Sequence, residues 1–262
     1  MEDKEAFLSI VIPVFNEGET LAAVVGKVIE FVPSLLEIII VDDASTDRTS
    51  EVAQALAVIH NNVRLARHAK NTGKTGALKT GFAMTRGDVV IVQDADLEYD
   101  PSGIAHVIKP ILDGHADVVY GSRFLVRKAT RVLYFYHFFG NKVLTLLSNS
   151  LTNLNMTDVE TGYKAFRGEI IRNMRISSNG FGFEIEATAK VAKLGCAIYE
   201  VPISYYGRTY DEGKKIGFAD GLKALWYALR FNLFCDLRSS FDKIPQPKLT
   251  RESSQPSETE QG

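Results

Sequence analysis

This sequence of 262 residues has few cysteines, and its positive and negative charges nearly cancel. Its two cysteines, Cys196 and Cys235, are too few for a disulfide framework and lack the spacing of metal ligands, which favours a reducing, cytoplasmic compartment. Thirty basic and 32 acidic side chains leave a formal charge of −2, so we expect no protein held on nucleic acid by its overall charge. No run of about 18 uncharged apolar residues occurs, and the N-terminal segment MEDKEAF lacks the basic start of a signal peptide. The sequence therefore predicts neither a membrane-spanning helix nor secretion.

What the sequence does contain is the composition of a globular protein, with 45% hydrophobic and 24% charged residues. Short runs rich in Val and Ile alternate with helical patterns through the first half. We expect strands at 8–15, 37–43, 63–68, 88–94 and 116–122, with helices at 17–31 after a cap at Asn16, from Ser45 or Thr46 to 58, and at 101–114. This order predicts an α/β fold whose mostly parallel sheet is flanked by helices and binds ligands beyond the carboxyl ends of its strands.

The second half of the sequence is less regular. It predicts an aromatic helix at 131–151, strands at 162–166 and 197–203, a helix at 183–195, and one C-terminal amphipathic helix at 218–237. The aromatic residues of 131–151 and 218–237 suit either the protein core or a membrane interface. After Phe241 the chain is polar and has little to bury, so we expect one domain over 1–241 and a disordered tail over 242–262.

Pairs of carboxylates follow two of the expected strands: Asp42 and Asp43 in IIIVDDAST, and Asp94 and Asp96 in VVIVQDADLEYDP. Ionised carboxylates next to buried strands need a cation or hydrogen-bond donors to offset their desolvation. Alternate residues of an extended chain point the same way, so Asp94 and Asp96 can share a site that binds Mg²⁺ or Mn²⁺ and a sugar or ribose hydroxyl. The alternative is an Asp that only caps the following helix, but two acidic clusters at the strand ends of one sheet favour a binding site.

The segment NTGKTG (71–76) resembles the end of a phosphate-binding loop. The first glycine of that loop would stand at position 68, which is His68, and the dinucleotide fingerprint G-x-G-x-x-G is absent as well. We therefore do not expect a P-loop enzyme. Lys74 either approaches a bound donor or belongs to an ordinary turn and helix start.

Seven motifs occur in the order found in family 2 inverting glycosyltransferases: IPVFNE (12–17), VDDASTDRT (41–49), NTGKTGALKTG (71–81), DADLEYDP (94–101), GSR (121–123), TGYKAF (161–166) and EVPISYYGRTYDEGKK (200–215). Over residues 7–237 the chain resembles the polyprenyl-phosphate, or dolichyl-phosphate, mannose and glucose synthases of this family. The resemblance implies a Rossmann-like GT-A fold. It also implies transfer of a hexose from a nucleotide-diphosphate sugar, GDP-mannose or UDP-glucose, to a polyprenyl phosphate.

The resemblance assigns the acidic and apolar motif residues to the donor side. Pro13, Phe15 and Glu17 match positions that hold the nucleobase and ribose, and Asp42 or Asp43 matches the acid near the base. Asp94, Asp96 and Glu98 match ligands of Mg²⁺ or Mn²⁺. Relatives often have Tyr in place of Phe15 and Gln in place of Glu98.

The same resemblance assigns the basic motif residues to phosphate binding. Arg123, Arg208 and either Lys214 or Lys215 match positions that bind the acceptor phosphate and the donor diphosphate, although relatives usually read R-x-x-G-x-S-K with a shorter spacing. Asp158, with Thr161 and Gly162, either forms the acceptor-side loop or caps a turn. The residues implied in catalysis itself are Asp94, Asp96, Arg123, Arg208 and Lys215.

No histidine lies within these motifs. An acceptor phosphate is already an anion at neutral pH, so the transfer needs no dedicated general base. Two alternatives remain, namely a family 2 transferase acting on a sugar or small soluble hydroxyl and a noncatalytic nucleotide-sugar-binding subunit. For the lipid-phosphate enzyme we expect peripheral contact with the cytoplasmic face of a membrane and no nucleic acid partner.

Overall fold

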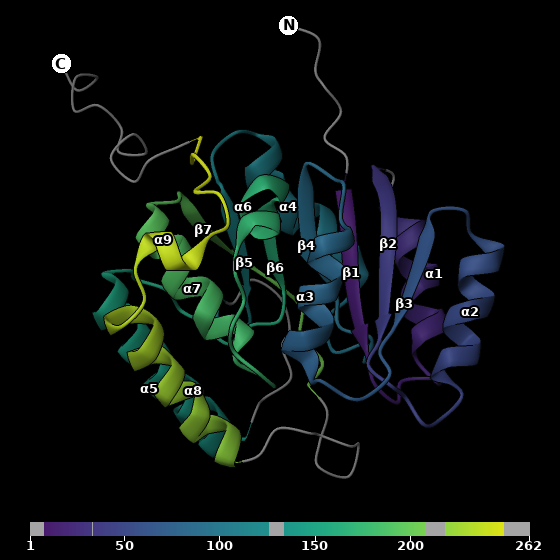
Figure 1. Ribbon diagram of the computed structural model, residues 1–262, viewed down its shortest axis with the longest axis horizontal. Helices are drawn as coiled ribbons and strands as arrows, with labels where there is room; N and C mark the ends of the chain where they lie inside the picture. The colour runs from purple at the N-terminus through teal and green to yellow at the C-terminus, as the bar shows by residue number, and fades with distance from the viewer. Residues whose placement is uncertain (1–7, 33, 126–133, 208–217, 249–262) are drawn as a thin grey trace, which may run out of the picture.

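Strands rich in Val and Ile form a seven-stranded sheet among the described residues, with helices on both faces (Figure 1). The structure is a computed structural model that describes residues 8–32, 34–125, 134–207 and 218–248. The strands are β1 (Leu8–Val14), β2 (Leu35–Asp42), β3 (Val63–Arg67), β4 (Val89–Val92), β5 (Val118–Ser122), β6 (Lys164–Arg167) and β7 (Ile198–Pro202), in the order β3-β2-β1-β4-β6-β5-β7. All of these strands point the same way except β6, which runs antiparallel to β4 and β5. The predicted α/β fold with a mostly parallel sheet is confirmed.

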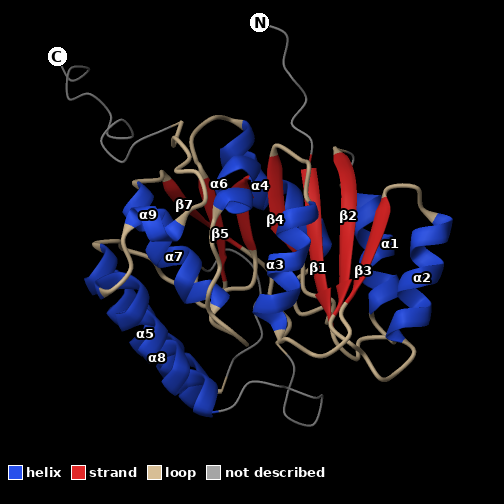
Figure 2. Cartoon of the chain, in the orientation of Figure 1, coloured by secondary structure: helices blue, strands red, loops and turns tan. Residues whose placement is uncertain are grey.

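The helices pack on the sheet in two layers (Figure 2). One face is covered by α1 (Leu21–Phe31), α2 (Thr49–Ile59) and α4 (Ile104–Leu112), which follows the short 3-10 helix η1 (Pro101–Gly103). The other face is covered by α3 (Lys74–Met84), α6 (Gly168–Asn173) and α7 (Phe183–Leu194). A further pair, α5 (Phe135–Thr152) and α8 (Phe218–Leu233), packs on α7, and α9 (Leu237–Ser240) follows α8. Because both faces are covered, β1, β2 and β4 are buried almost throughout.

The reversed direction of β6 decides which loops reach the functional edge of the sheet. Parallel strands bring their carboxyl ends to one edge, so the loops after β1, β2, β3, β4, β5 and β7 gather there. Since β6 runs the other way, the loop that precedes it, residues 157–163, arrives at the same edge. The TGYKAF motif therefore meets the carboxylates that follow β4.

Two predicted helix starts are wrong, because the residues expected as caps bind each other instead. Asn16 has a left-handed φ of 56°, which asparagine tolerates better than most residues. Its N–H donates to Ser45 Oγ at 3.0 Å, and its Oδ1 accepts the Thr46 N–H at 2.9 Å. The loops after β1 and β2 are thereby joined, and the helices begin later, at Leu21 and Thr49.

The single helix predicted at 218–237 is also wrong, because the chain forms two helices there. The first ends at Leu233, and the second begins at Leu237 after the cap Asp236, whose carboxylate accepts the Ser239 N–H at 2.6 Å. A side chain that caps a new helix start competes with continuation of the preceding helix.

The chain beyond Phe241 continues along the domain as far as it is described. The Lys248 N–H donates to Oδ1 of the buried Asp117 at 3.0 Å, and Arg175 forms an ion pair with Asp242 at 2.6 Å. Contacts with the domain therefore extend to Lys248, and the domain boundary at 241 that composition predicted stays a prediction. These contacts use backbone groups and charges, which a count of apolar residues does not detect. Residues 249–262 lie outside the described residues.

Candidate functional site

The end of β1 supplies the three residues predicted at the nucleobase and ribose. Pro13 lies in β1 opposite Val41, and Phe15 and Glu17 follow it, all three half-buried. The Glu17 N–H donates to Thr49 Oγ1 at 2.9 Å, so the loop after β1 is fastened to the start of α2. The three residues lie at the functional edge, and their contact with a base stays a prediction.

The two acids after β2 have separate sets of hydrogen-bond donors. Asp42 accepts the Ser45 N–H at 2.9 Å and the hydroxyl of Ser50. Burial would raise the pKa of Asp42, but these bonds and the charge of Arg67 outweigh it and lower the pKa below its ordinary value.

Asp43 fixes the loop that carries Lys74. Its carboxylate accepts the backbone N–H groups of Thr72, at 2.9 Å, and Gly73, at 2.7 Å. The Thr72 hydroxyl and a ring nitrogen of His68 also lie within hydrogen-bond distance of Asp43 Oδ1, at 2.7 and 2.6 Å. The acid expected near the base thus also determines where α3 begins.

Lys74, the first residue of α3, connects two acids from distant parts of the chain. Its ammonium lies 2.9 Å from Asp94, after β4, and 3.3 Å from Oε1 of Glu184, in the first turn of α7. Burial alone would lower the pKa of Lys74, but the charges of Asp94 and Glu184 outweigh it and raise the pKa above its ordinary value. Lys74 therefore stays charged and places a cation on Asp94.

Gly162 makes room for this ion pair. A Cβ at this position would lie 2.5 Å from Asp94 Oδ2 and 3.2 Å from Lys74 Nζ. The Gly162 N–H donates to the hydroxyl of Tyr99 at 3.0 Å, which holds the loop close to the residues after β4. Any side chain larger than hydrogen would displace Asp94 or Lys74.

The residues predicted to bind a metal lie on the turn after β4. Leu97 has a left-handed φ of 61°, and the Asp96 carboxylate accepts the Glu98 N–H at 3.0 Å across this turn. Glu98 in turn accepts the hydroxyl of Tyr205 at 2.8 Å. Within the described ranges, no three His, Cys, Asp or Glu side chains gather closely enough to form a ready metal site.

The chemistry of these residues nevertheless fits a divalent cation. Carboxylate oxygens are the ligands that Mg²⁺ and Mn²⁺ prefer. The Lys74 ammonium lies 2.9 Å from Asp94, so a positive charge already stands beside the carboxylate that would bind the metal. The role of Glu98 as a third ligand stays a prediction.

Arg123 and Asp158, both predicted to serve the acceptor, form a buried ion pair with each other. Arg123 Nε and Nη2 each donate to one carboxylate oxygen of Asp158 at 2.7 Å. The Arg123 side chain is 13% exposed and that of Asp158 is 0% exposed. Burial would raise the pKa of Asp158, but the charge and hydrogen bonds of Arg123 hold it below the usual value. This fork joins the end of β5 to the loop before β6, and its contact with a phosphate stays a prediction.

Three ionisable residues of the site escaped the sequence analysis: the buried Lys164 and Glu184 and the half-buried Glu160. Lys164 donates to the carbonyl oxygens of Val159, at 3.0 Å, and Thr161, and so closes the loop before β6. Glu160 Oε1 and Glu184 Oε2 are buried, and neither has a hydrogen-bond partner among the described residues. Burial, together with the charge of Glu184, raises the pKa of Glu160 to about 7. The detectable signals were Lys164 within TGYKAF, Glu160 directly before that motif, and Glu184 at the start of FEIEATAK.

Arg208, Lys214 and Lys215, the remaining predicted phosphate-binding residues, lie outside the described residues.

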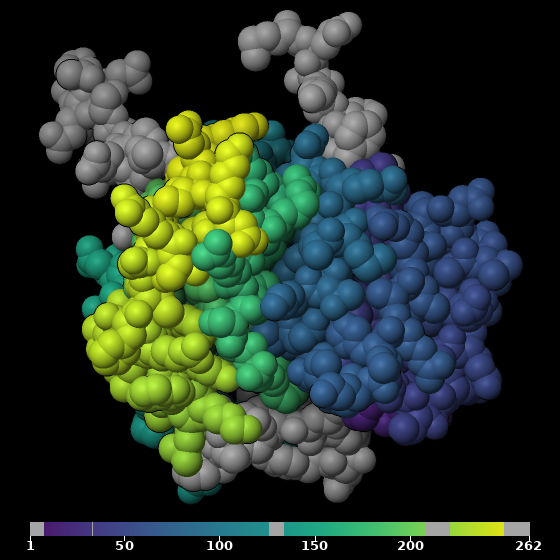
Figure 3. Space-filling model, in the orientation of Figure 1, coloured from purple at the N-terminus to yellow at the C-terminus, as the bar shows by residue number. Residues whose placement is uncertain are grey.

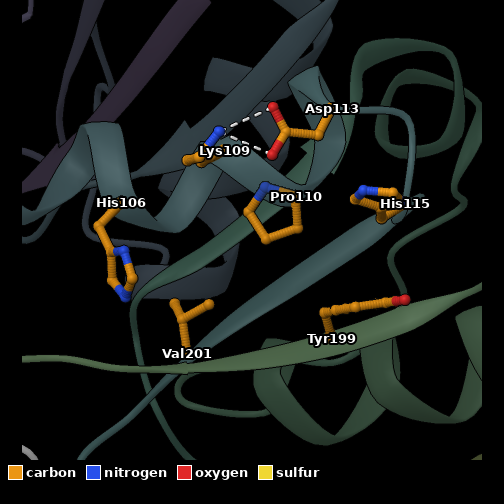
Figure 4. Close-up of a pocket in the computed structure, with 7 residues that line it drawn as sticks. All are labelled: His106, Lys109, Pro110, Asp113, His115, Tyr199 and Val201. Carbon is orange, nitrogen blue, oxygen red and sulfur yellow. Dashed lines mark hydrogen bonds and ion pairs between the residues drawn. The ribbon is translucent and has the colours of Figure 1, made fainter.

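A cavity of about 190 Å³ lies elsewhere, between α4 and the edge strand β7 (Figure 4). It is lined by His106, Lys109, Pro110, Asp113, His115, Tyr199 and Val201. Lys109 is paired with Asp113 at 2.8 Å within α4 and its C-terminal cap. None of the residues that the sequence assigned to the site lines this cavity.

Comparison with known sequences identifies several similar proteins. Residues 9–175 match the family model described as Glycosyl transferase family 2. The undecaprenyl-phosphate mannosyltransferase of Micrococcus luteus is 31% identical over an alignment 248 residues long. The alignment covers 85% of this chain and 97% of that protein. The polyprenol monophosphomannose synthase of Mycolicibacterium smegmatis is 29% identical over 79% of this chain and 80% of its own. The dolichol-phosphate mannosyltransferase of Pyrococcus furiosus is 31% identical over 80% of this chain but only 59% of its own length.

Comparison with solved structures confirms the predicted GT-A fold. Glucosyl-3-phosphoglycerate synthase from Mycobacterium tuberculosis, crystallised with Mn²⁺, UDP and glucosyl-3-phosphoglycerate, has a TM-score of 0.68 over 88% of this chain and 81% of its own, at 22% identity. The same enzyme with Mg²⁺ and UDP has a TM-score of 0.67. At this identity the likeness establishes the fold alone.

Proposed function

Because this chain belongs to glycosyl transferase family 2, we propose that it moves a hexose from a nucleotide-diphosphate sugar to a polyprenyl phosphate, with inversion of the anomeric carbon. The chain is a glycosyltransferase, and the proposal concerns its substrates. The relatives named above are named for undecaprenyl phosphate, polyprenol monophosphomannose and dolichol phosphate, which supports a lipid-phosphate acceptor. The structural observation that carries the proposal is the pair Asp94 and Asp96 at the end of the buried β4, at the same edge as the cation Lys74.

The donor side of the site suits a metal-bound diphosphate. Bound by Asp94 and Asp96, Mg²⁺ or Mn²⁺ would act as a Lewis acid that offsets the negative charge on the leaving diphosphate. The chain contributes the positions of these groups: Asp43 fixes the loop before Lys74, and Gly162 leaves room beside Asp94. The Mn²⁺ and Mg²⁺ complexes of the Mycobacterium tuberculosis enzyme support a divalent metal. We propose GDP-mannose or UDP-glucose as the donor.

The acceptor side suits an anion that needs no deprotonation. A phosphate monoester is charged at neutral pH, whereas a sugar hydroxyl needs a general base. His68 touches the acidic cluster, but its ring nitrogens bond to Asp43 at 2.6 Å and to Thr80 Oγ1 at 2.8 Å. The carboxylate of Asp158 is bound by Arg123. These two side chains are therefore engaged by other groups of the protein, which is consistent with a phosphate acceptor.

A lipid acceptor requires contact with a membrane, and we propose that α5 and α8 provide it on the cytoplasmic face. The outer sides of these helices expose Tyr136 (84%), Phe135, Phe139, Leu146, Trp226 (57%) and Leu233. Figure 3 shows α8 as the lower left surface of the molecule, beside α5. Phe231, also in α8, is fully buried and belongs to the core. In the portions of the chain that the structure describes, we find no helix with the length and apolar composition needed to cross a bilayer.

Acceptor specificity gives the direct test of the proposed function. Purified protein is incubated with Mn²⁺ and radiolabelled GDP-mannose or UDP-glucose, together with a polyprenyl phosphate, the matching free polyprenol, or soluble sugars. We expect transfer to the lipid phosphate with one of the two donors and at least about a hundredfold slower transfer to the alcohol, since the phosphate supplies the charged nucleophile.

The same experiment separates the alternatives. Equal rates with the phosphate and the free alcohol, or preference for a soluble sugar, would establish a hydroxyl acceptor instead. Donor binding without transfer to any acceptor would establish a noncatalytic nucleotide-sugar-binding subunit.

A further inference from the structure

Lys74 occupies a position between two carboxylates that differ in what else they bind. Asp94, at 2.9 Å, belongs to the turn that carries the proposed metal ligands. Glu184, at 3.3 Å, lies in α7, and its Oε2 is buried without a hydrogen-bond partner among the described residues. Glu184 therefore has an unused oxygen that can accept a hydrogen bond from the lysine ammonium, which carries three donors.

The backbone around Lys74 is held firmly on the side of Glu184. Thr75 N–H and Oγ1 both donate to the Gly180 carbonyl oxygen at 2.9 Å, and the Phe183 N–H donates to Thr75 Oγ1 at 3.2 Å. Gly73 approaches so closely that a Cβ there would lie 3.0 Å from Gly180 Cα. The starts of α3 and α7 are thus joined, and only the flexible stem of Lys74 remains to move its charge.

A divalent cation at Asp94 cannot share the position of an ammonium ion that lies 2.9 Å from the same carboxylate. Two cations that approach the oxygens of one carboxylate repel each other. A lysine that leaves Asp94 also needs another acceptor, because an unpaired buried charge is costly. The buried Oε2 of Glu184 supplies that acceptor without any movement of the backbone.

We propose that Glu184 is a positioning residue that receives the Lys74 ammonium when a divalent cation binds Asp94. Before the metal binds, the Lys74 ammonium lies 2.9 Å from Asp94 and 3.3 Å from Oε1 of Glu184; afterwards it pairs with Glu184 alone and lies at the edge of the donor site. The inference rests on the proposed function in one respect, which is that Asp94 binds the metal. It assigns to Glu184 and Lys74 a joint effect on metal affinity.

The test is a double-mutant cycle on Mn²⁺ affinity, measured by the electron paramagnetic resonance signal of free Mn²⁺ with the full chain, alone and with GDP or UDP. Lys74→Met should tighten Mn²⁺ binding, because the competing cation is gone, and Glu184→Gln should weaken it by at least about fivefold. In the Lys74→Met background, Glu184→Gln should change the affinity less than about twofold, since there is no lysine left to receive. Through-space attraction between Glu184 and the metal would instead give equal effects in both backgrounds and would overturn the proposal.

Two matched controls complete the design. Glu160→Gln removes another carboxyl group of the same cluster, one that forms no ion pair with Lys74, and it should act equally in both backgrounds. Lys79→Met removes an exposed cation from the same helix and should leave Mn²⁺ affinity unchanged. If Lys74→Met does not fold, Lys74→Gln replaces it. If neither folds, the proposal requires Glu184→Gln, but not Glu160→Gln, to weaken Mn²⁺ binding about fivefold.

The outcome also separates this inference from the proposed function. If the wild type binds Mn²⁺ and the effects of Lys74→Met and Glu184→Gln on the affinity are additive, the proposed movement of Lys74 is wrong. The glycosyltransferase proposal is then unaffected. Absence of Mn²⁺ binding in every condition overturns both the lysine transfer and the metal site.

Discussion

The two aspartates after β4 have different partners, and this difference makes Asp96 the better single-residue probe of the metal. Asp94 is held by Lys74, so its removal also releases the Lys74 cation, whereas the Asp96 carboxylate accepts the Glu98 N–H within the turn. Asp96→Asn keeps an oxygen for the Glu98 N–H but loses the negative charge. We expect an intact fold and transfer slowed by at least about a hundredfold, as for loss of a key electrostatic group.

The measurement for Asp96→Asn is the initial rate of transfer, with circular dichroism as the check on folding. EDTA should abolish transfer by the wild type, and added Mn²⁺ or Mg²⁺ should restore it. A variant close to the wild-type rate, or a wild type that works in EDTA, would remove Asp96 from the metal site.

Glu160 makes the stability of the folded protein depend on pH, and the raised pKa of its carboxyl group sets the direction of that dependence. Burial and the charge of Glu184 raise the pKa of Glu160 from 4.5 to about 7. The folded protein thus holds a proton that the unfolded chain releases, so this contribution to stability is complete below about pH 4.5 and is lost as the pH rises to about 7. Glutamine cannot ionise, so Glu160→Gln avoids that loss.

We therefore expect the melting temperature of Glu160→Gln, relative to wild type, to increase between pH 4.5 and 7 and to level off above. The charged neighbours Glu184, Lys164, Arg123 and Asp158 are present in both proteins, so the two proteins differ only in the carboxyl group of Glu160. Each kcal/mol corresponds to about 2 to 4 °C in a protein of this size. Thermal melts across this range give the result, with the exposed Glu19→Gln as the control. A difference that stays constant with pH would contradict the assignment.

At the scale of elements, α5 and α8 leave an apolar surface that the core does not use. Their inner residues, including Leu144 and Ala228, are buried against α7, while Tyr136 and Trp226 face outward. Replacing both outward residues, as Tyr136→Ser and Trp226→Ser, should lower binding to anionic vesicles by at least about tenfold, since each side chain contributes about 1.5–3 kcal/mol when buried in an apolar phase.

Liposome flotation measures this effect directly. The matched control is Val58→Ser with Ile59→Ser, which removes two equally exposed apolar residues from α2 on another part of the surface. Equal loss of binding in both double variants, or no flotation of the wild type, would count against α5 and α8 as the membrane surface.

Elements with a strong apolar period were predictable, and those formed by polar contacts were not. The runs of Val and Ile made β1, β2 and β4 predictable, because a sheet covered on both faces needs continuous apolar segments. The start of α1 was missed because Asn16 bonds to the loop after β2, a contact across the sheet that no local pattern encodes.

At the scale of the whole molecule, the candidate site is assembled from loops that the sequence identifies one at a time. The acids after β4 could be predicted, since carboxylates at the end of a buried strand need a partner. Their partner could not, because the Lys74–Glu184 contact joins helix starts about 110 positions apart and depends on how α3 and α7 meet. The position of Gly162 beside Asp94 likewise follows from the reversed direction of β6.

The extent of the folded unit is itself testable through the segment after Phe241. Asp117 is fully buried and binds three groups: Arg167 at 2.9 Å, the Ala197 N–H at 3.1 Å and the Lys248 N–H at 3.0 Å. A chain that ends at residue 241 loses the Lys248 bond and the Arg175–Asp242 ion pair, while the charge of Asp117 stays buried. Loss of a donor to a buried charged group costs about 1–3 kcal/mol.

We therefore expect a chain ending at Phe241 to melt lower than the full-length protein by several degrees, at about 2 to 4 °C per kcal/mol. A chain ending at Lys248 should melt with the full-length protein, because the sequence beyond it is polar and has little to bury. Differential scanning calorimetry of the three lengths, at one pH and protein concentration, compares them directly. The same melting temperature for all three would return the domain boundary to residue 241, and a loss in the chain ending at Lys248 would move it further toward the C-terminus.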